Sequence, residues 1–191
     1  METDLADDLD ARLAVRLRDL RAQHGLSLDA LAERAGVSRS MISLVERGES
    51  SPTAATLHRL AAGLGVTMHD LFADTVQQDA SPLAVRARQP LWRDPDTGYT
   101  RRELSPPGFD TPLHLLEVVL PSGARVAYDA VAPVQQQLWV VEGQVQVRME
   151  RTVHKLARGD CLAMRSTANS FHNPGDKPAR YLIAAVKAGV R

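Results

Sequence analysis

The sequence predicts a two-domain protein: an N-terminal all-α bundle of five helices and a C-terminal all-β barrel of the jelly-roll type. In the first part, apolar residues recur three or four positions apart, and these segments end at glycines. In the second part, short apolar runs rich in β-formers are separated by proline and glycine turns. We expect the domains to cover residues 1–74 and 83–191, joined by a polar linker at 75–82.

The first helix is expected over residues 9–24, where Leu13, Leu17 and Leu20 form one apolar stripe and Gly25 follows the last turn. Two helices at the far end of the domain close its core. They are expected from Thr53 to Gly65 and from Thr67 to Phe72.

Residues 28–47 are the most informative segment, because they predict two short helices meeting at a tight turn. Ser27 and Ser38 precede these helices as N-caps. Gly36 stands between them, where a left-handed backbone conformation is cheap only without a β-carbon. This spacing is typical of a helix-turn-helix, whose second helix enters the major groove of DNA.

Residues 16–72 resemble the Cro/C1 (XRE) family of DNA-binding domains, and the likeness includes Glu46-Arg47-Gly48 after the second helix of the motif. In that family the equivalent glutamate pairs with an arginine of the first helix, which here would be Arg21. The alternative is a helical bundle with no role in nucleic-acid binding.

Arg39 is the favoured base reader, since its planar fork suits the two acceptors of guanine. Met41 could contact a thymine methyl or pack against the core. The remaining side chains are expected at bases or phosphates. The complete set expected to bind DNA is Ser27, Leu28, Ser38, Arg39, Ser40, Met41, Ser43, Arg47, Ser51 and Thr53. The expected partner is double-stranded DNA with a palindromic operator, bound by a homodimer.

Charge is unevenly divided between the two parts. Residues 1–74 hold eight Lys and Arg against twelve Asp and Glu, a net charge of −4, and residues 75–191 carry +4. Because DNA-binding domains are often basic, we expect few phosphate contacts and a shallow dependence of affinity on salt.

The β part contains runs of four to eight residues bounded by turns, which indicate a sandwich or small barrel rather than alternating strands and helices. Five strands are expected: 113–120, 137–143, 144–150, 160–164 and 180–186.

The order of motifs in this part resembles the two sequence blocks of the cupin fold. The motifs are Pro121-Ser122-Gly123, Trp139 to Val145, Leu156 to Asp160 and Phe171 to Gly175. Together with the N-terminal domain, the chain is similar to XRE regulators that carry a cupin domain, and this resemblance implies a sensing role.

Metal-binding cupins use histidines and one glutamate, and this chain departs from that pattern. Gln136 and Asn169 stand where the glutamate and the second-block histidine would be, and residues 129–132 contain no histidine. Neutral amides are weak ligands for transition metals. We therefore expect no metal, no cofactor and no enzymatic activity, with a cupin-fold metalloenzyme as the alternative.

The barrel is expected to bind a small-molecule effector through neutral polar groups in an apolar cavity. The expected residues are His114, Tyr128, Gln136 and Asn169. The alternative is a filled barrel that serves dimerisation. Trp139 is expected at a sheet face or subunit contact, with stacking on a ligand as the alternative. Arg101-Arg102 is expected at an exposed strand edge, with an anion site as the alternative.

Cys161 is the only cysteine, which excludes an intrachain disulfide. A small buried hydrophobe is expected there, with an inter-subunit redox switch as the alternative. Without an apolar N-terminal segment or a long apolar run, the chain is expected in the cytoplasm. The sequence thus predicts a DNA-binding transcriptional regulator, with repression favoured, and an antitoxin-like interaction module as a further alternative.

Overall fold

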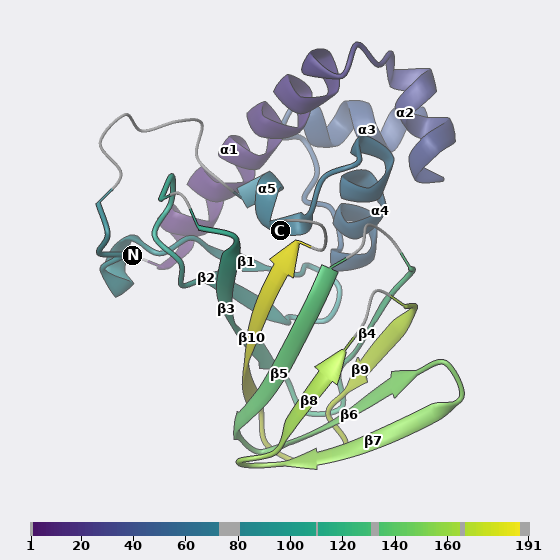
Figure 1. Ribbon diagram of the computed structural model, residues 1–191. Coiled ribbons are helices and arrows are strands. Elements are labelled where there is room, and N and C mark those ends of the chain that lie inside the picture. Colours follow the sequence, from purple (N-terminus) through teal and green to yellow (C-terminus); the bar gives the residue numbers. More distant parts are fainter. Residues whose placement is uncertain (1, 73–80, 110, 131–133, 165–166, 188–191) are drawn as a thin grey trace.

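A computed structural model describes residues 2–72, 81–109, 111–130, 134–164 and 167–187. A helical domain lies on one end of an antiparallel β-sandwich (Figure 1). This confirms the predicted fold class. Most of the expected linker at 75–82 falls outside the described residues. Within the described ranges, no helix is both long and apolar enough to cross a membrane.

The helical domain has the expected order of elements, and three of its helices begin at the predicted caps. Ala30 N–H donates to Ser27 Oγ at 3.1 Å, and Met41 N–H donates to Ser38 Oγ at 3.2 Å. Gly36 has a φ of 61°, as its place at the turn requires. The helices are α1 (Glu2–Gln23), α2 (Leu28–Ala35), α3 (Arg39–Glu46), α4 (Ala54–Leu64) and α5 (Met68–Phe72).

Helix α1 begins at Glu2, so the expectation that it starts at residue 9 is wrong. Helix α1 packs beside β1 (Leu91–Arg93) of the second domain, a neighbour that the sequence of the first domain alone cannot show.

The core of this domain is aliphatic. Leu17, Leu31, Ile42 and Leu57 are completely buried. Helices α2 and α4 approach so closely that a β-carbon added at Gly63 would lie 2.9 Å from the Ala35 Cβ. The residue at position 63 must therefore be glycine for α2 to pack on α4 at this distance.

The sandwich consists of two antiparallel sheets. The six-stranded sheet has the order β1-β2-β3-β10-β5-β8, and the four-stranded sheet has the order β4-β9-β6-β7. All five expected strands are present, as β3 (Leu113–Leu120), β5 (Val134–Glu142), β6 (Gln144–Met149), β8 (Cys161–Met164) and β10 (Ala179–Lys187). The sequence did not predict β1 (Leu91–Arg93), β2 (Thr100–Glu103), β4 (Arg125–Tyr128), β7 (Thr152–Ala157), β9 (Asn169–His172) or the 3-10 turn η1 (Arg86–Arg88).

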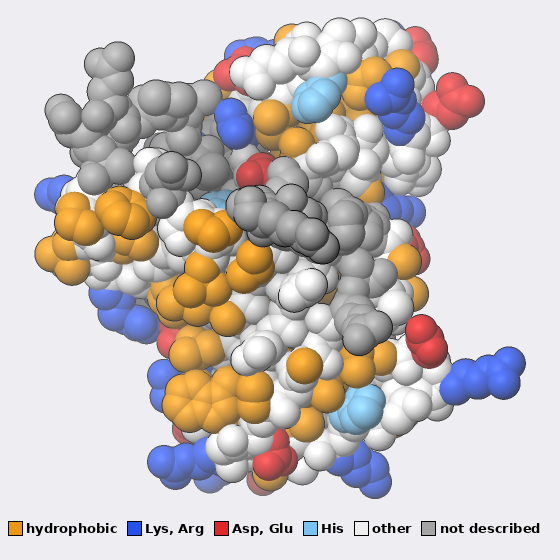
Figure 2. Space-filling model, in the orientation of Figure 1, with side chains coloured by type: hydrophobic (Ala, Val, Ile, Leu, Met, Phe, Trp, Pro, Cys, Tyr) orange, Lys and Arg blue, Asp and Glu red, His pale blue; other side chains and the backbone are white. Residues whose placement is uncertain are grey.

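The outer face of the six-stranded sheet carries exposed apolar side chains, gathered over β3, β10 and β5 (Figure 2). Leu113, Leu115 and Trp139 are 41%, 38% and 50% exposed. Cys161, beside Trp139 on β8, is also exposed, so the expectation of a buried cysteine is wrong. The alternation of β8 turns Met164 inward and Cys161 outward.

The two domains meet through α1, α4 and α5, while α3 lies on the side away from the sandwich (Figure 1). Helix α4 packs against β4. His58 Nε2 on α4 lies 2.8 Å from the Asp129 carbonyl oxygen, and its ring centroid lies 4.9 Å from that of Tyr128. The helix expected to read DNA is therefore not covered by the barrel.

Candidate DNA-binding surface and interdomain cavity

Helix α3 divides sharply into a buried and an open side. Ile42 and Val45 are buried against the other helices, whereas Arg39 and Ser40 are exposed. Met41 is half-buried and contacts the core from its rim. The packing of the buried side thus holds the N-terminal turn of the helix outward.

Glu46, at the end of α3, is paired with Arg21 of α1, as the family resemblance implied. Arg21 donates to both carboxylate oxygens of Glu46, at 2.6 and 2.8 Å, and to the Leu26 carbonyl at 2.9 Å. The hydrogen bond to Glu46 raises the pKa of Arg21, against the effect of burial. This bidentate pair neutralises the acid and fixes α3 against α1.

The basic residues on this surface have acidic neighbours that sequence reasoning did not pair with them. Arg39 Nε lies 3.2 Å from Asp29 Oδ1 on α2. Arg47 donates to both oxygens of Glu49, at 2.7 and 2.8 Å, and also to the Ser43 hydroxyl. Both pairs are exposed, so DNA phosphates can compete with the carboxylates.

The other residues expected to bind DNA surround the same surface. Ser27 and Ser38 cap α2 and α3, and Thr53 caps α4. Leu28 is half-buried at the start of α2, and the exposed Ser51 hydroxyl donates to the Asp10 carboxylate on α1. The expected set thus lies on α3 and at the starts of α2 and α4, with Arg47 and Ser51 in the segment after α3, and the role of each residue remains a prediction.

A cavity of about 130 Å³ lies where α4 and α5 meet the open end of the sandwich. All four residues expected to bind an effector line it: His114, Tyr128, Gln136 and Asn169. Sequence reasoning missed other lining residues, including Tyr99, Arg101 and Tyr181 of the sandwich and His58 and His69 of the helical domain. The cavity is therefore shared by both domains.

Arg101 is buried, with 9% of its surface exposed, so the expectation of an exposed strand edge at this residue is wrong. Its Nε donates to Glu103 Oε1 at 2.7 Å, and its guanidinium lies 5.7 Å from the ring centroid of Phe72 on α5. Although burial would lower the pKa of Arg101, the charge of Glu103 raises it. Arg101 and Glu103 are two residues apart along β2, so their side chains lie on one face of the strand. This spacing can be recognised in the sequence.

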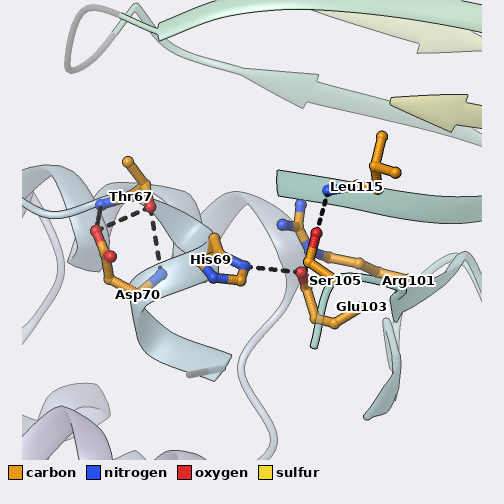
Figure 3. A network of polar contacts seen from close by, with 7 residues as sticks. All are labelled: Thr67, His69, Asp70, Arg101, Glu103, Ser105 and Leu115. Carbon is orange, nitrogen blue, oxygen red and sulfur yellow. Dashed lines mark hydrogen bonds and ion pairs between the residues drawn. The ribbon is translucent and has the colours of Figure 1, made fainter. Parts of the chain in front are cut away.

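His69 of α5 reaches across the domain boundary to the same carboxylate (Figure 3). Its Nδ1 lies 2.9 Å from Glu103 Oε2, and its ring stacks on His114 with centroids 3.7 Å apart. Thr67 and Asp70 fix the start of α5 by reciprocal hydrogen bonds of 2.7 to 3.2 Å. Burial raises the pKa of Glu103, but Arg101 and His69 outweigh it and keep the pKa below its ordinary value.

The cavity contains buried polar atoms without partners. Within the described parts of the chain, His114 Nδ1 and Asn169 Oδ1 are shielded from solvent and form no hydrogen bond. Such atoms are costly unless a ligand or water satisfies them. Burial is also the main cause that raises the pKa of Tyr99, Tyr128 and Tyr181, so these hydroxyls remain protonated at neutral pH.

Metal-ligating side chains do not converge in the described ranges, which contain no group of three or more His, Cys, Asp or Glu residues able to hold an ion. Gln136 and Asn169, which the resemblance to cupins places at ligand positions, both line the cavity. Their side chains are neutral hydrogen-bonding amides.

The fold and the exposed α3 define the class of helix-turn-helix proteins, and comparisons with known proteins agree. The helix-turn-helix family HTH_3 matches residues 17–71. The regulator SutR of Escherichia coli is 50% identical over 83 residues, which are 44% of this chain and 46% of SutR. The chain spans less than half the length of that relative.

Two further relatives are matched over most of their length. The uncharacterized HTH-type transcriptional regulator y4dJ of Sinorhizobium fredii is 37% identical over 67 residues, which are 35% of this chain and 83% of y4dJ. The crystal structure of an HTH_3 family transcriptional regulator from Vibrio cholerae is 30% identical, covers 94% of this chain and 98% of its own, and superposes with a TM-score of 0.75. This chain belongs to the HTH_3 (XRE-type) family of helix-turn-helix transcriptional regulators.

Proposed function

We propose that this protein is a sequence-specific DNA-binding transcriptional regulator, with residues 1–74 reading DNA and residues 83–191 serving dimerisation and sensing. The observation that carries this proposal is the open side of α3, where Arg39 and Ser40 project from a helix anchored by buried Ile42 and Val45. A helix presented in this way fits the major groove, with its N-terminal residues at the base edges.

Roles within the surface follow from chemistry and position. Arg39 is 63% exposed at the first turn of α3 and is suited to the O6 and N7 acceptors of guanine. Arg47, Ser51 and the capped start of α4 at Thr53 lie at the margin, where phosphates pass. Base recognition is therefore assigned to α3 and positioning to its surroundings.

Selection of bound duplexes from a random DNA pool tests the proposal. We expect a short palindrome, because two copies of one reading head related by a two-fold axis require one. The same selection is repeated with the full-length Arg39→Ala variant. The duplexes that this variant enriches should show no preference at one base pair in each half-site. Enrichment of no sequence by the unaltered protein would contradict sequence-specific binding.

The proposed dimer forms through the apolar outer face of the six-stranded sheet. Leu115 of β3, Leu182 of β10 and Trp139 of β5 point to this face, and strand pairing places Leu182 directly opposite Trp139. Exposed apolar patches of this kind mark interfaces. We propose a second copy of this chain as the occupant, because helix-turn-helix proteins bind DNA as two-fold dimers and most soluble oligomers are homodimers.

The proposed sensing site is the cavity shared by the domains. It combines an apolar wall that includes Leu116 and Ile183 with the unpartnered atoms of His114 and Asn169. Apolar cavities with a few fixed polar groups are the usual form of small-molecule sites.

A further inference from the structure

The cavity wall contains more hydrogen-bond donors than acceptors around Arg101. A guanidinium has five N–H donors and no acceptor. Only the Nε donor is bonded to Glu103 in the described residues. The Tyr99 hydroxyl interacts with Arg101 and with Tyr128, so part of this donor set is already used within the wall. An acceptor-rich ligand would complete this cluster.

Arg101 is the buried cation of the cavity wall. Among the described lining residues it is the only lysine or arginine, and Asp70 and Asp129 are the carboxylates. The Asp129 side chain is 76% exposed and Asp70 accepts hydrogen bonds from Thr67, whereas the buried Arg101 guanidinium is held in place by Glu103 and by the Phe72 ring. A fixed fork is suited to bidentate bonds with a carboxylate. Apolar side chains beside Arg101 offer a surface for a short hydrocarbon tail: Leu116 and Ile183 on the same sheet, and Phe171 on the other sheet.

Size limits the ligand further. The cavity volume of about 130 Å³ is close to that of a cavity of roughly 150 Å³ that holds benzene in another protein. Molecules of about six to eight non-hydrogen atoms therefore fit.

We propose that the effector is a small organic carboxylate, held by Arg101 on the sandwich side and covered by α4 and α5 of the DNA-binding domain. This rests on the proposed sensing function and names its ligand class. Helix residues His58, Met68 and His69 form the cover. Binding is consequently linked to the docking of the two domains, because the ligand touches both.

Butyrate and butyramide test the class, since they share the same number of non-hydrogen atoms and differ in charge. Isothermal titration of the full-length protein should give a dissociation constant at least about tenfold lower for butyrate, because charge-assisted hydrogen bonds are roughly twice as strong as neutral ones. Equal affinities, or binding of neither compound, would overturn the carboxylate assignment.

Two variants test the place of binding without removing a buried charge. Ala185→Leu fills the cavity from β10 and should abolish butyrate binding. Ala127→Leu makes the same change at an exposed site on β4 and should bind as the unaltered protein does. If Ala185→Leu retains butyrate affinity, the ligand lies elsewhere.

Hydrogen exchange of the full-length protein tests the cover. Butyrate should slow exchange in peptides covering α4 and α5 as well as in those from β2 and β3. Protection confined to the sandwich would contradict a shared site. Each preparation should also be tested for binding to the selected duplex: loss of butyrate binding with DNA binding intact overturns only this inference, whereas loss of DNA binding in the unaltered protein overturns the proposed function.

Discussion

The carboxylate of Asp94, in the turn after β1, accepts a hydrogen bond of 3.1 Å from the backbone N–H of Ala54, the first residue of α4. The Asp94 side chain is almost fully buried and also accepts from Thr97, through its N–H at 3.2 Å and its hydroxyl at 2.5 Å. A helix N-terminus favours a negative charge. The sandwich therefore holds the DNA-binding domain by the start of α4.

Replacement of Asp94 should weaken this attachment. We expect Asp94→Ala to lower the free energy of unfolding by about 1–3 kcal/mol, the range for a buried donor left without its acceptor. Thermal or urea unfolding measures the change. Asp96→Ala, two residues further in the same turn and exposed, is the control and should have little effect.

Arg39→Ala should reduce affinity for the selected operator by about 1–3 kcal/mol and relax preference at one base pair. The reason is the loss of a bidentate contact at a base edge. Fluorescence anisotropy with specific and random duplexes measures both effects, with Arg148→Ala on the sandwich surface as the control. An equal loss on both duplexes would mean that Arg39 contacts only the backbone.

Glu49→Gln should strengthen binding to random DNA. Glu49 holds Arg47 with two hydrogen bonds, and without its charge the guanidinium is available to a phosphate. The slope of log affinity against log salt should steepen by about 0.9, the value for one added phosphate contact. The control is Glu33→Gln, an exposed site on α2, and an unchanged slope in Glu49→Gln would argue against a phosphate role for Arg47.

Trp139→Glu should dissociate the proposed dimer, because it places a charge in the centre of the apolar face. Native mass spectrometry or light scattering measures the mass in solution. Val153→Glu introduces the same charge on the exposed surface of β7, in the other sheet, and should leave the dimer intact. Dimers that persist in Trp139→Glu would show that the subunits meet through a different surface.

Acidification should loosen the attachment of the domains. Burial lowers the pKa of His58, opposed by its hydrogen bond to the Asp129 carbonyl. The unfolded chain, with an ordinary histidine pKa, takes up this proton first as the pH falls. The stability linked to neutral His58 is thus present above about pH 6.5 and is lost as the pH falls through the lowered pKa.

His58→Phe removes the proton but retains a ring beside Tyr128. The decrease in melting temperature between pH 7.5 and 5.5 should therefore be smaller in this variant than in the unaltered protein. His24→Phe, at the exposed end of α1, is the control. An identical decrease in all three proteins would exclude His58 as a source of the pH dependence.

The helical domain could be predicted from sequence because its signals are local. Ser27 and Ser38 cap the first turns of their own helices, and the left-handed backbone conformation at Gly36 depends on that residue alone. The Arg21–Glu46 pair is a contact between distant residues, and only the family resemblance indicated it. The contact of α1 with β1 joins the two domains and has no such local signal.

Part of the cavity wall could be predicted from the sequence. Gln136 and Asn169 follow from the resemblance to the cupin motifs, and His114 and Tyr128 were also expected there. Arg101 was read as an exposed edge because its burial depends on Phe72 and His69, which come from the other domain. A sequence-based analysis that treats each domain alone cannot anticipate side chains buried between domains.

Gly63 gives the close contact of α2 with α4 a mechanical consequence. Helix α4 packs on the sandwich, and Ala35 of α2 lies in direct contact with Gly63 of α4. Because this contact has no free space, α2 and α4 cannot slide past each other. A tilt of α4 on the sandwich would turn the reading head as one rigid piece, and in a dimer the separation of the two heads would change with it.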